Sequence, residues 1–472
     1  MTEHGDRPAL SDDRETLTFL ELGAGTDRAA SSLRNAGVGP GGRVAIVLPN
    51  SCTFVQVALA VLRCGASVFP INPGAQPREL VRLLGETPVV AMVGAEALVR
   101  AHAPTGTAGL APTETGLTIL RDRPGPAPIA RATRPLDAAL TAYSSGTVTR
   151  PHLVTRTQEN LWWEAENFHA ATGLGPDDVI LGVVPLSHAH GFGNALLASL
   201  RSGAHLVVRE RFHRGDVLDL LEREHVTTFP TVPFMLRTLT SAGRRRRWDL
   251  ETLRWCISAG APLSRDIANA FRDRFGVTVR QLYGLTEAGS VTLNTATSND
   301  IDPTSVGMPL GTTTVTIVDA DGLPVPPDTE GEIVVHSDAA MGGRDAPLRT
   351  HDRGHCDVDG ALRITGRTSL FINCAGNKVD PAEVEEALRQ HPAVGEAAVF
   401  GVPAAHGEET VTAAVVLQDD CSADALREHC RTLLAGYKVP RVIHLRDTLP
   451  RSALGKVLVG RLVDEVASTT HQ

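Results

Sequence analysis

The sequence predicts an α/β protein: a large N-terminal domain of two βα-layered subdomains plus a small β-subdomain, followed by a small α+β domain. Apolar segments of strand length alternate with helical segments through the first part of the chain. Short alternating strands begin near residue 313, and a capped helix followed by strands begins after Arg367. Because 472 residues exceed what one hydrophobic core serves, we expect two domains, at 1–367 and 368–472.

The N-terminal segment predicts a βαβ unit. Thr18 and Glu21 have the spacing of a capping box and begin a helix that ends at Gly37. Three elements follow: a nearly all-apolar strand at 43–49, a helix capped by Ser51 and a strand at 67–73. Strands joined by a helix in this way pair in parallel, so the pattern indicates a parallel sheet.

The same alternation returns in the second subdomain. Further strands are expected at 178–186, 204–210, 226–232 and 253–260. Between the two halves, 102–135 is rich in Ala, Pro, Gly and Thr, and we expect irregular surface chain there. For the C-terminal domain we expect a helix within 379–392 and strands at 394–403 and 411–420.

Composition excludes several classes of protein. A formal net charge of −9 argues against nucleic acid as the main partner, since such partners need a basic face. The seven cysteines are scattered and never form a CxxC pair, which suits a reducing cytoplasm and indicates neither a disulfide framework nor a zinc cluster. The polar N-terminus is unlike a signal peptide, and Arg63 and Gly65 interrupt the apolar stretch 54–71. We expect a cytoplasmic protein without membrane partners.

The segment "YSSGTVTRPH", residues 143–152, has the residue types of a phosphate-holding loop. Backbone N–H groups and small hydroxyls form a concave set of donors that suits phosphate oxygens. The candidate nucleotide-binding residues here are Ser144, Ser145, Gly146 and Thr147. The loop contains no lysine, and a Ser/Thr/Gly loop without function remains an equal alternative.

A stronger candidate is "QLYGLTEAG" at 281–289. Tyr283, followed by Gly284, could stack on a base, and Thr286 could bond a phosphate. Glu287 offers the hard oxygen ligand that Mg²⁺ prefers. The alternative is a core aromatic next to a solvated carboxylate.

Three charged residues nearer the C-terminus complete the set. Asp352 could accept hydrogen bonds from ribose hydroxyls, and Arg367 could add a charge-assisted bond. Lys456, behind Gly455, is a cationic donor suited to an anionic reacting centre. Each of them has an ordinary surface residue as its alternative.

Together these motifs resemble the adenylate-forming superfamily of acyl-CoA synthetases, peptide-synthetase adenylation domains and luciferases. The resemblance runs from end to end. Its ordered motifs are "PLSHAHGF" (185–192), "SAGAPL" (258–263), "YGLTEAG", "RTHDRG", "GRTSLFINCAGNKVDPAEVE" (366–385) and "LPRSALGK". It implies an ATP- and Mg²⁺-dependent enzyme with a mobile C-terminal domain that rotates at a hinge, here Ser369.

The resemblance also assigns roles to single positions. It implies that Lys456 bridges the substrate carboxylate and the α-phosphate, that Thr286 contacts phosphate and that Glu287 helps to bind Mg²⁺. It implies that adenine is bordered by Gly260, Ala261, Pro262 and Tyr283, and that ribose is held by Asp352 and Arg367. His188 matches a residue that gates the acid pocket, and with His190 it forms an H-x-H pair that lacks the further ligands a metal site needs.

The phosphate loop departs from the family pattern T-S-G-T-T-G-x-P-K-G. Val148, Thr149, His152 and Leu153 stand where the family has Thr, Gly, Lys and Gly. We hypothesise that Arg150, and not His152, supplies the missing positive charge. At the hinge, Ser369 and Leu370 replace the acidic pair that relatives often carry.

The remaining motifs bear on the acid and the acceptor. Ala189 replaces the acidic residue of domains that bind an α-amine, so an α-amino acid is disfavoured. Phe192, Phe234 and Met235 suggest an apolar pocket for an aryl, cinnamyl or medium acyl acid, with core packing as the even alternative. The stretch around Gly376 resembles a pantetheine tunnel, so the expected acceptor is the thiol of CoA or of a carrier protein's phosphopantetheine.

Two other readings stay open from the sequence. One is an adenylate-forming enzyme with a non-thiol acceptor or an unusual anion, as in amide formation or nitrite-dependent diazotisation. The other is a nonenzymatic nucleotide-binding protein, because the phosphate loop is altered.

Overall fold

A computed structural model describes the chain in ranges separated by short gaps. The described residues are 4–75, 77–113, 116–123, 133–144, 152–241, 246–296, 301–367, 372–374, 377–403, 409–452, 455 and 457–469. The statements that follow concern these residues.

The first subdomain is built on a seven-stranded sheet. Its strands are β3 (Arg43–Val47), β4 (Ser67–Pro70), β5 (Ala91–Gly94), β6 (Ala108–Thr113), β7 (Gly116–Arg121), β8 (Ala138–Tyr143) and β9 (Leu153–Thr157). They are ordered β7-β6-β5-β3-β4-β8-β9, and β3 pairs in parallel with β4 and β5. The predicted βαβ unit is therefore confirmed.

The prediction of irregular chain over 102–135 is wrong for 108–113 and 116–121, which form strands, whereas the described residues 103–107, 122–123 and 133–135 are irregular. β6 and β7 form an antiparallel pair within this range, and β6 pairs in parallel with β5. Ala108 and Leu110 are fully buried, so small apolar side chains serve here as the inner face of a strand. Composition alone suggested a loop because glycine and proline are rarer inside strands than in turns.

The second subdomain is built on a nine-stranded sheet. Its strands are β1 (Pro8–Ser11), β2 (Thr16–Thr18), β10 (Val179–Gly182), β11 (His205–Val208), β12 (Thr228–Thr231), β13 (Trp255–Ser258), β14 (Val279–Leu285), β15 (Gly289–Leu293) and β16 (Met308–Pro309). The order is β16-β15-β14-β13-β12-β10-β11-β1-β2. From β11 to β14 the neighbours pair in parallel, as the four predicted strands required.

Helices cover both sheets. They are α1 (Phe19–Asn35), α2 (Cys52–Arg63), α3 (Pro77–Glu86), α4 (Glu96–His102), α5 (Gln158–Thr172), α6 (Ala189–Gly191), the π-helix η1 (Phe192–Leu197), α7 (Ala198–Ser202), α8 (Arg214–Arg223), α9 (Pro233–Thr240) and α10 (Arg265–Phe275). The capping box of Thr18 with Glu21 and the cap at Ser51 are present as predicted. One core cluster joins residues of both sheets, such as Ile46 and Ile180, through α1, α2 and α5.

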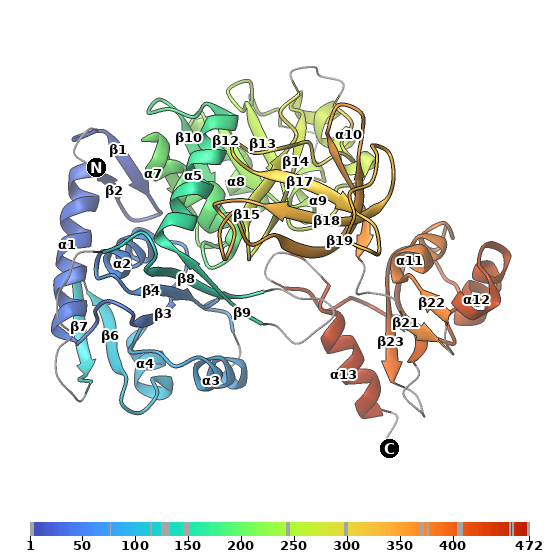
Figure 1. Cartoon of the computed structure of the whole chain (residues 1–472), viewed down its shortest axis with the longest axis horizontal. Helices are drawn as coiled ribbons and strands as arrows, with labels where there is room; N and C mark the ends of the chain where they lie inside the picture. Colours follow the sequence, from blue (N-terminus) through green and yellow to red (C-terminus); the bar gives the residue numbers. More distant parts are fainter. Residues whose placement is uncertain are drawn as a thin grey trace.

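The rest of the chain forms smaller units. The β-subdomain is a four-stranded antiparallel sheet of β17 (Thr314–Val318), β18 (Gly331–His336), β19 (Leu348–Cys356) and β20 (Leu362–Arg367). The C-terminal elements are β21 (Ile372–Cys374), β22 (Asn377–Val379), α11 (Pro381–Arg389), β23 (Val394–Pro403), β24 (Glu409–Leu417), α12 (Ala423–Leu433), the 3-10 turn η4 (Gly436–Lys438), β25 (Val442–Arg446) and α13 (Val459–Thr469). In Figure 1 these orange to red elements form a lobe beside the larger part.

Within the described ranges, none of the helices combines the length and the apolar character needed to cross a lipid bilayer.

Candidate active site

The predicted adenine loop follows β13 at the carboxyl edge of the nine-stranded sheet. β12, β13 and β14 run in parallel, with Ser258 paired to Thr231 on one side and to Gln281 on the other. Gly260, Ala261 and Pro262 are exposed just beyond this edge. Gly260 has φ +81°, a left-handed backbone that glycine adopts without strain. Crevices at the carboxyl ends of parallel strands are where α/β sheets bind ligands.

A buried glutamine holds this loop in place. The Leu263 N–H donates to the Oε1 atom of Gln281 at 3.0 Å, and the Gln281 side-chain amide donates to the Pro303 carbonyl. Gln281 is the first residue of the "QLYGLTEAG" motif, and its structural role was not predicted. Gln281 is buried together with its neighbours Leu282 and Tyr283 on β14.

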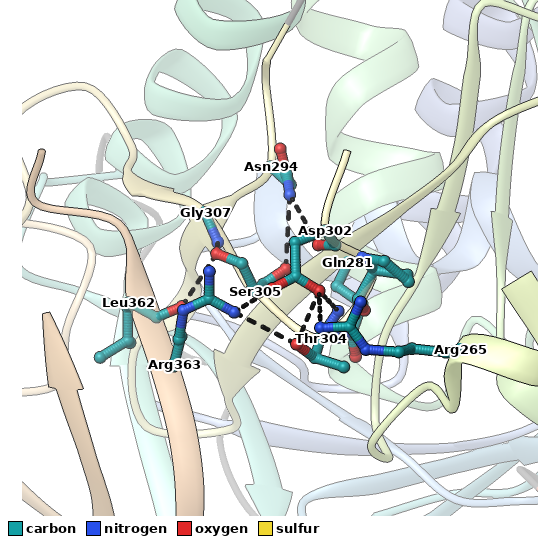
Figure 2. Close-up of polar contacts among 10 residues, drawn as sticks. Arg265, Gln281, Asn294, Asp302, Thr304, Ser305, Gly307, Leu362 and Arg363 are labelled. Carbon is teal, nitrogen blue, oxygen red and sulfur yellow. Dashed lines mark hydrogen bonds and ion pairs between the residues drawn. The ribbon is translucent and has the colours of Figure 1, made fainter. Parts of the chain in front are cut away.

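A cluster of charged residues around Asp302, which we call the ionic hub, holds residues 302–304 before β16 (Figure 2). Asp302 accepts hydrogen bonds from Arg363 of β20 and from the Thr304 backbone N–H, and it lies 3.0 Å from Arg265 at the start of α10. Partial burial by itself would raise the pKa of Asp302, but the hydrogen bonds from Arg363 and Thr304 outweigh it and lower that pKa to about 2. The hub thereby ties the β-subdomain to the loop beside Gln281.

The predicted base-stacking and ribose-holding residues touch one another. Tyr283 on β14 donates its hydroxyl to the Oδ2 atom of Asp352 on β19 at 2.5 Å. Both residues are buried, and the Asp352 backbone pairs with Arg367 of β20 in the antiparallel register. Tyr283 also packs in the apolar cluster of the β-subdomain. It is therefore a core aromatic, the alternative expected from the sequence, and at the same time a neighbour of the predicted ribose-holding residue.

The turn between β14 and β15 carries Thr286 and Glu287, both half-buried. The Oε1 atom of Glu287 lies 3.0 Å from Nε2 of His152, which is the residue at the family's lysine position. Nδ1 of the same ring lies 2.9 Å from the Ser144 hydroxyl. His152 therefore bridges the described start of the phosphate loop and the predicted Mg²⁺ ligand, a contact that the sequence did not predict.

The two histidines of the H-x-H pair differ in their partners. Nε2 of His190 lies 3.0 Å from the Thr231 carbonyl, which can only accept, so Nε2 carries the proton. Nδ1 then accepts from Asn194 at 2.8 Å, and Asn194 in turn accepts from the Ser290 hydroxyl at 2.7 Å. Among the described residues, the buried Nε2 of His188 has no hydrogen-bond partner.

Burial lowers the pKa of each of these histidines to about 4. For His190, hydrogen bonds to the Thr231 and Ile257 backbone oppose this lowering but do not cancel it. Both imidazoles are consequently neutral at neutral pH. A neutral pair offers hydrogen bonds to a ligand but no positive charge.

The three residues predicted to line an apolar acid pocket, Phe192, Phe234 and Met235, lie in different surroundings. Phe192 begins the π-helix η1 and, at 1% exposure, is part of the shared core. Met235 is also buried in a core cluster. Phe192 and Met235 are therefore core residues, which is the alternative to pocket residues that the sequence left open. Phe234 on α9 is 41% exposed and lies against Gly455, the neighbour of Lys456. Of the three, Phe234 remains the candidate for contact with a ligand.

Several predicted site residues lie outside the described residues. These are Ser145, Gly146, Thr147, Arg150, Ser369, Gly376 and Lys456, and the side chain of Arg367. The neighbouring described residues place the ends of these segments: Ser144 lies beside His152, and Gly455 lies beside Phe234.

Sequence models match nearly the whole chain. The AMP-binding enzyme model matches residues 1–343, and the model of the AMP-binding enzyme C-terminal domain matches residues 383–456. The chain belongs to the AMP-binding enzyme family. This confirms the predicted superfamily and the α/β class with a small C-terminal domain.

Curated relatives of this AMP-binding enzyme are CoA ligases. It is 34% identical to a feruloyl-CoA synthase of Amycolatopsis sp over 94% of this chain and 93% of the relative, and 33% identical to a sulfoacetate–CoA ligase of Cupriavidus necator over 96% and 93%. Its fold matches o-succinylbenzoate CoA synthetase of Bacillus subtilis in complex with ATP and magnesium ion, with a TM-score of 0.81, 28% identity and coverage of 97% and 96%.

The protein is therefore an ATP-dependent, AMP-forming acid–thiol ligase of the acyl-CoA synthetase type. Ligases of this type use ATP and CoA, and Mg²⁺ is typical of the family. A carboxylic acid and CoA are the implied substrates. In the structure of this AMP-binding enzyme, Tyr283 contacts Asp352. His152 contacts both Glu287 and Ser144.

Proposed function

We propose that this AMP-binding enzyme activates an acid with an uncharged tail, of the aryl, cinnamyl or medium acyl class, and transfers it to CoA. A carboxylate oxygen of the acid attacks the α-phosphorus of ATP, and the bond to pyrophosphate breaks. The thiol then attacks the acyl carbon of the adenylate and displaces AMP. Transfer to the phosphopantetheine of a carrier protein uses the same thiol chemistry and is the variant to test second.

The surroundings of His188 and His190 carry the choice of acid, because burial lowers the pKa of both imidazoles and so favours their neutral form. The feruloyl and sulfoacetate ligases have similar identities to this chain, yet a sulfonate keeps a negative charge that an aryl tail lacks. A second buried anion needs a cation to offset the loss of hydration. Two imidazoles with pKa values of about 4 supply hydrogen bonds only. The unpartnered Nε2 of His188 suits a hydroxyl or ether on such a tail.

The residue roles follow from position. We propose that ATP lies along the edge from Gly260 to the turn of Thr286, with the ribose at Asp352. The carboxylate of Glu287 is a suitable ligand for Mg²⁺, because hard oxygen donors are what this ion prefers. The ion would supply positive charge against the phosphate oxygens as pyrophosphate departs. Lys456 would approach from the C-terminal lobe, which joins the rest of the chain at the proposed hinge, Ser369.

The test is a pyrophosphate-release screen on the full chain, with AMP and thioester measured in parallel. Cinnamic and benzoic acids and medium-chain acids should release pyrophosphate, sulfoacetate should not, and CoA should be required for AMP release and thioester formation. If sulfoacetate were the only acid that releases pyrophosphate, the proposal of an uncharged tail would be wrong. Release of AMP with amines but not with CoA would contradict the thiol acceptor.

A further inference from the structure

A buried ion pair that the proposed chemistry does not use lies beside the predicted Mg²⁺ turn. Arg156 on β9 and Glu164 on α5 are 1% and 3% exposed at their side chains, and their charged atoms are 2.7 Å apart. Arg156 is the largest fully buried side chain among the described residues. Burying two charges costs so much hydration free energy that well-packed apolar residues of similar volume are often as stable as the ion pair.

The carboxylate of Glu164 separates two glycines that belong to different parts of the site. A Cβ atom on Gly193, in the π-helix that carries Asn194, would collide with this carboxylate. A Cβ atom on Gly289, two residues after Glu287, would collide with it as well. Both backbones therefore rest directly on Glu164, and its position sets their spacing. Such close approach is possible only for glycine.

Arg156 reaches the same turn by a second route. Its guanidinium donates to the Ala339 carbonyl at 3.1 Å and to the Asn160 carbonyl at 3.2 Å. Asn160 donates to the carbonyls on either side of Ala339, those of Asp338 and Ala340. The next residue, Met341, donates its N–H to the Glu287 carbonyl at 2.7 Å. The segment 338–341 thus connects Arg156 to the backbone of Glu287.

A third contact links the other end of the same strand to Glu287. His152, just before β9, lies 3.0 Å from the Glu287 carboxylate. The Thr286–Glu287 turn is therefore linked to His152, which precedes β9, and to the ion pair that Arg156 of β9 forms with Glu164 of α5.

We propose that the Arg156–Glu164 pair is a positioning element that holds the Thr286–Glu287 turn in register with the π-helix, and so sets the affinity for Mg²⁺-bound ATP. This rests on the proposed role of Glu287. The pair touches no substrate atom. It acts through the backbone of Gly289 and through the segment 338–341.

The test measures ATP binding by isothermal titration of the full chain, with Mg²⁺ present and with EDTA. Glu164→Gln leaves Arg156 buried without its partner and is expected to destabilise the fold. The deciding variant is therefore Arg156→Met/Glu164→Gln, which has no buried charge and similar volume. We expect its Kd for ATP with Mg²⁺ to rise about 10-fold or more, because small misplacements of ligand-holding groups are costly. In EDTA we expect a much smaller change.

The matched control is Asp178→Asn. Asp178 pairs with Arg254 and accepts from the Gly175 N–H at 2.8 Å, at the amino end of β10, away from the carboxyl edge. It should lose stability and keep its ATP affinity. Unchanged affinity in the double variant, an equal loss in Asp178→Asn, or a double variant that does not fold would each overturn the proposal. A wild-type chain that binds no ATP would overturn the proposed function itself.

Discussion

His152 occupies the position at which the family's phosphate loop carries lysine, and its ring already has two protein partners. Nδ1 lies 2.9 Å from Ser144 and Nε2 lies 3.0 Å from Glu287. An imidazole has only these two polar atoms, so the ring has no further donor for a phosphate in this arrangement. This supports the hypothesis that another residue, Arg150, provides the cation.

We expect Arg150→Ala to lower the rate of pyrophosphate release by roughly 10²- to 10³-fold, the usual loss when a donor to the transition state is removed. His152→Ala should have a smaller effect on this rate, because it removes a contact of Glu287 rather than a phosphate ligand. Single-turnover assays at saturating ATP would compare the two variants. The reverse order of effects would assign the missing charge to His152.

For single residues, the sequence predicted candidate site positions but not which of these residues contact one another. Tyr283 and Asp352 were predicted separately, as a base-stacking residue and a ribose acceptor. Their hydrogen bond joins strands of two different sheets, and no periodicity in the sequence encodes such a pairing. The assignments of Phe192 and Met235 were ambiguous for a similar reason, because an apolar residue suits a pocket and a core equally.

Helix α9 contacts the C-terminal lobe through two of its side chains, Arg237 and Phe234. Arg237 on α9 lies 3.3 Å from Glu396 of β23, and Glu396 also accepts a hydrogen bond from Arg451. Arg451 donates to the Gly455 carbonyl at 2.5 Å, and Gly455 lies against Phe234 of α9. Glu396 thus links the helix to the turn that precedes Lys456.

We expect Arg237→Ala to slow adenylate formation about 3- to 10-fold while the conversion of preformed adenylate to thioester keeps its rate. The link holds the lobe in the orientation with Gly455 at Phe234, and an exposed pair of this kind contributes about 1 kcal/mol. Rapid-quench measurement of each half-reaction would separate the two. Arg246→Ala, which removes an exposed arginine paired with Asp219 and Glu222 on α8, is the control and should affect neither.

The boundaries of the elements were predictable where capping and apolar runs agreed. Thr18, Glu21 and Ser51 mark true helix starts because their side chains bond the free N–H groups of the first turn. Strand β6 was missed because its residues are mostly small and include a glycine and a proline. Strand β7 contains the β-branched Thr118 and Ile119, but it lies in a stretch whose overall composition is typical of a loop. The boundary at 367–368 and the hinge at Ser369 stay predictions.

For the whole molecule, the half-buried His188 and His190 predict how stability depends on pH. The pKa values of His188 and His190 lie near 4 in the folded chain and near 6.5 when unfolded. Below pH 6.5 the unfolded chain binds protons that the folded chain does not. Stability from this source is complete above pH 6.5 and is lost as the pH falls toward 4.

Urea unfolding at pH 7, 6 and 5 should therefore show a falling free energy of unfolding. His190→Gln, whose amide can still donate to Thr231 and accept from Asn194, should show a shallower decline than the wild type. Equal slopes for the two proteins would contradict the assignment of a neutral imidazole at position 190.

The distribution of apolar clusters indicates which parts of the chain could be exchanged with those of a relative without loss of folding. The cluster that joins Ile46 and Ile180 belongs to both sheets at once, whereas the clusters around Val384 and Phe400 contain residues of the C-terminal lobe alone. A chimera that exchanged the first or the second subdomain with that of a relative would have to rebuild the apolar interior that the two subdomains share. A C-terminal lobe taken from a relative would need to match mainly the polar contact between Glu396 and Arg237. Exchange of this lobe should therefore give folded chimeras more readily than exchange of either subdomain.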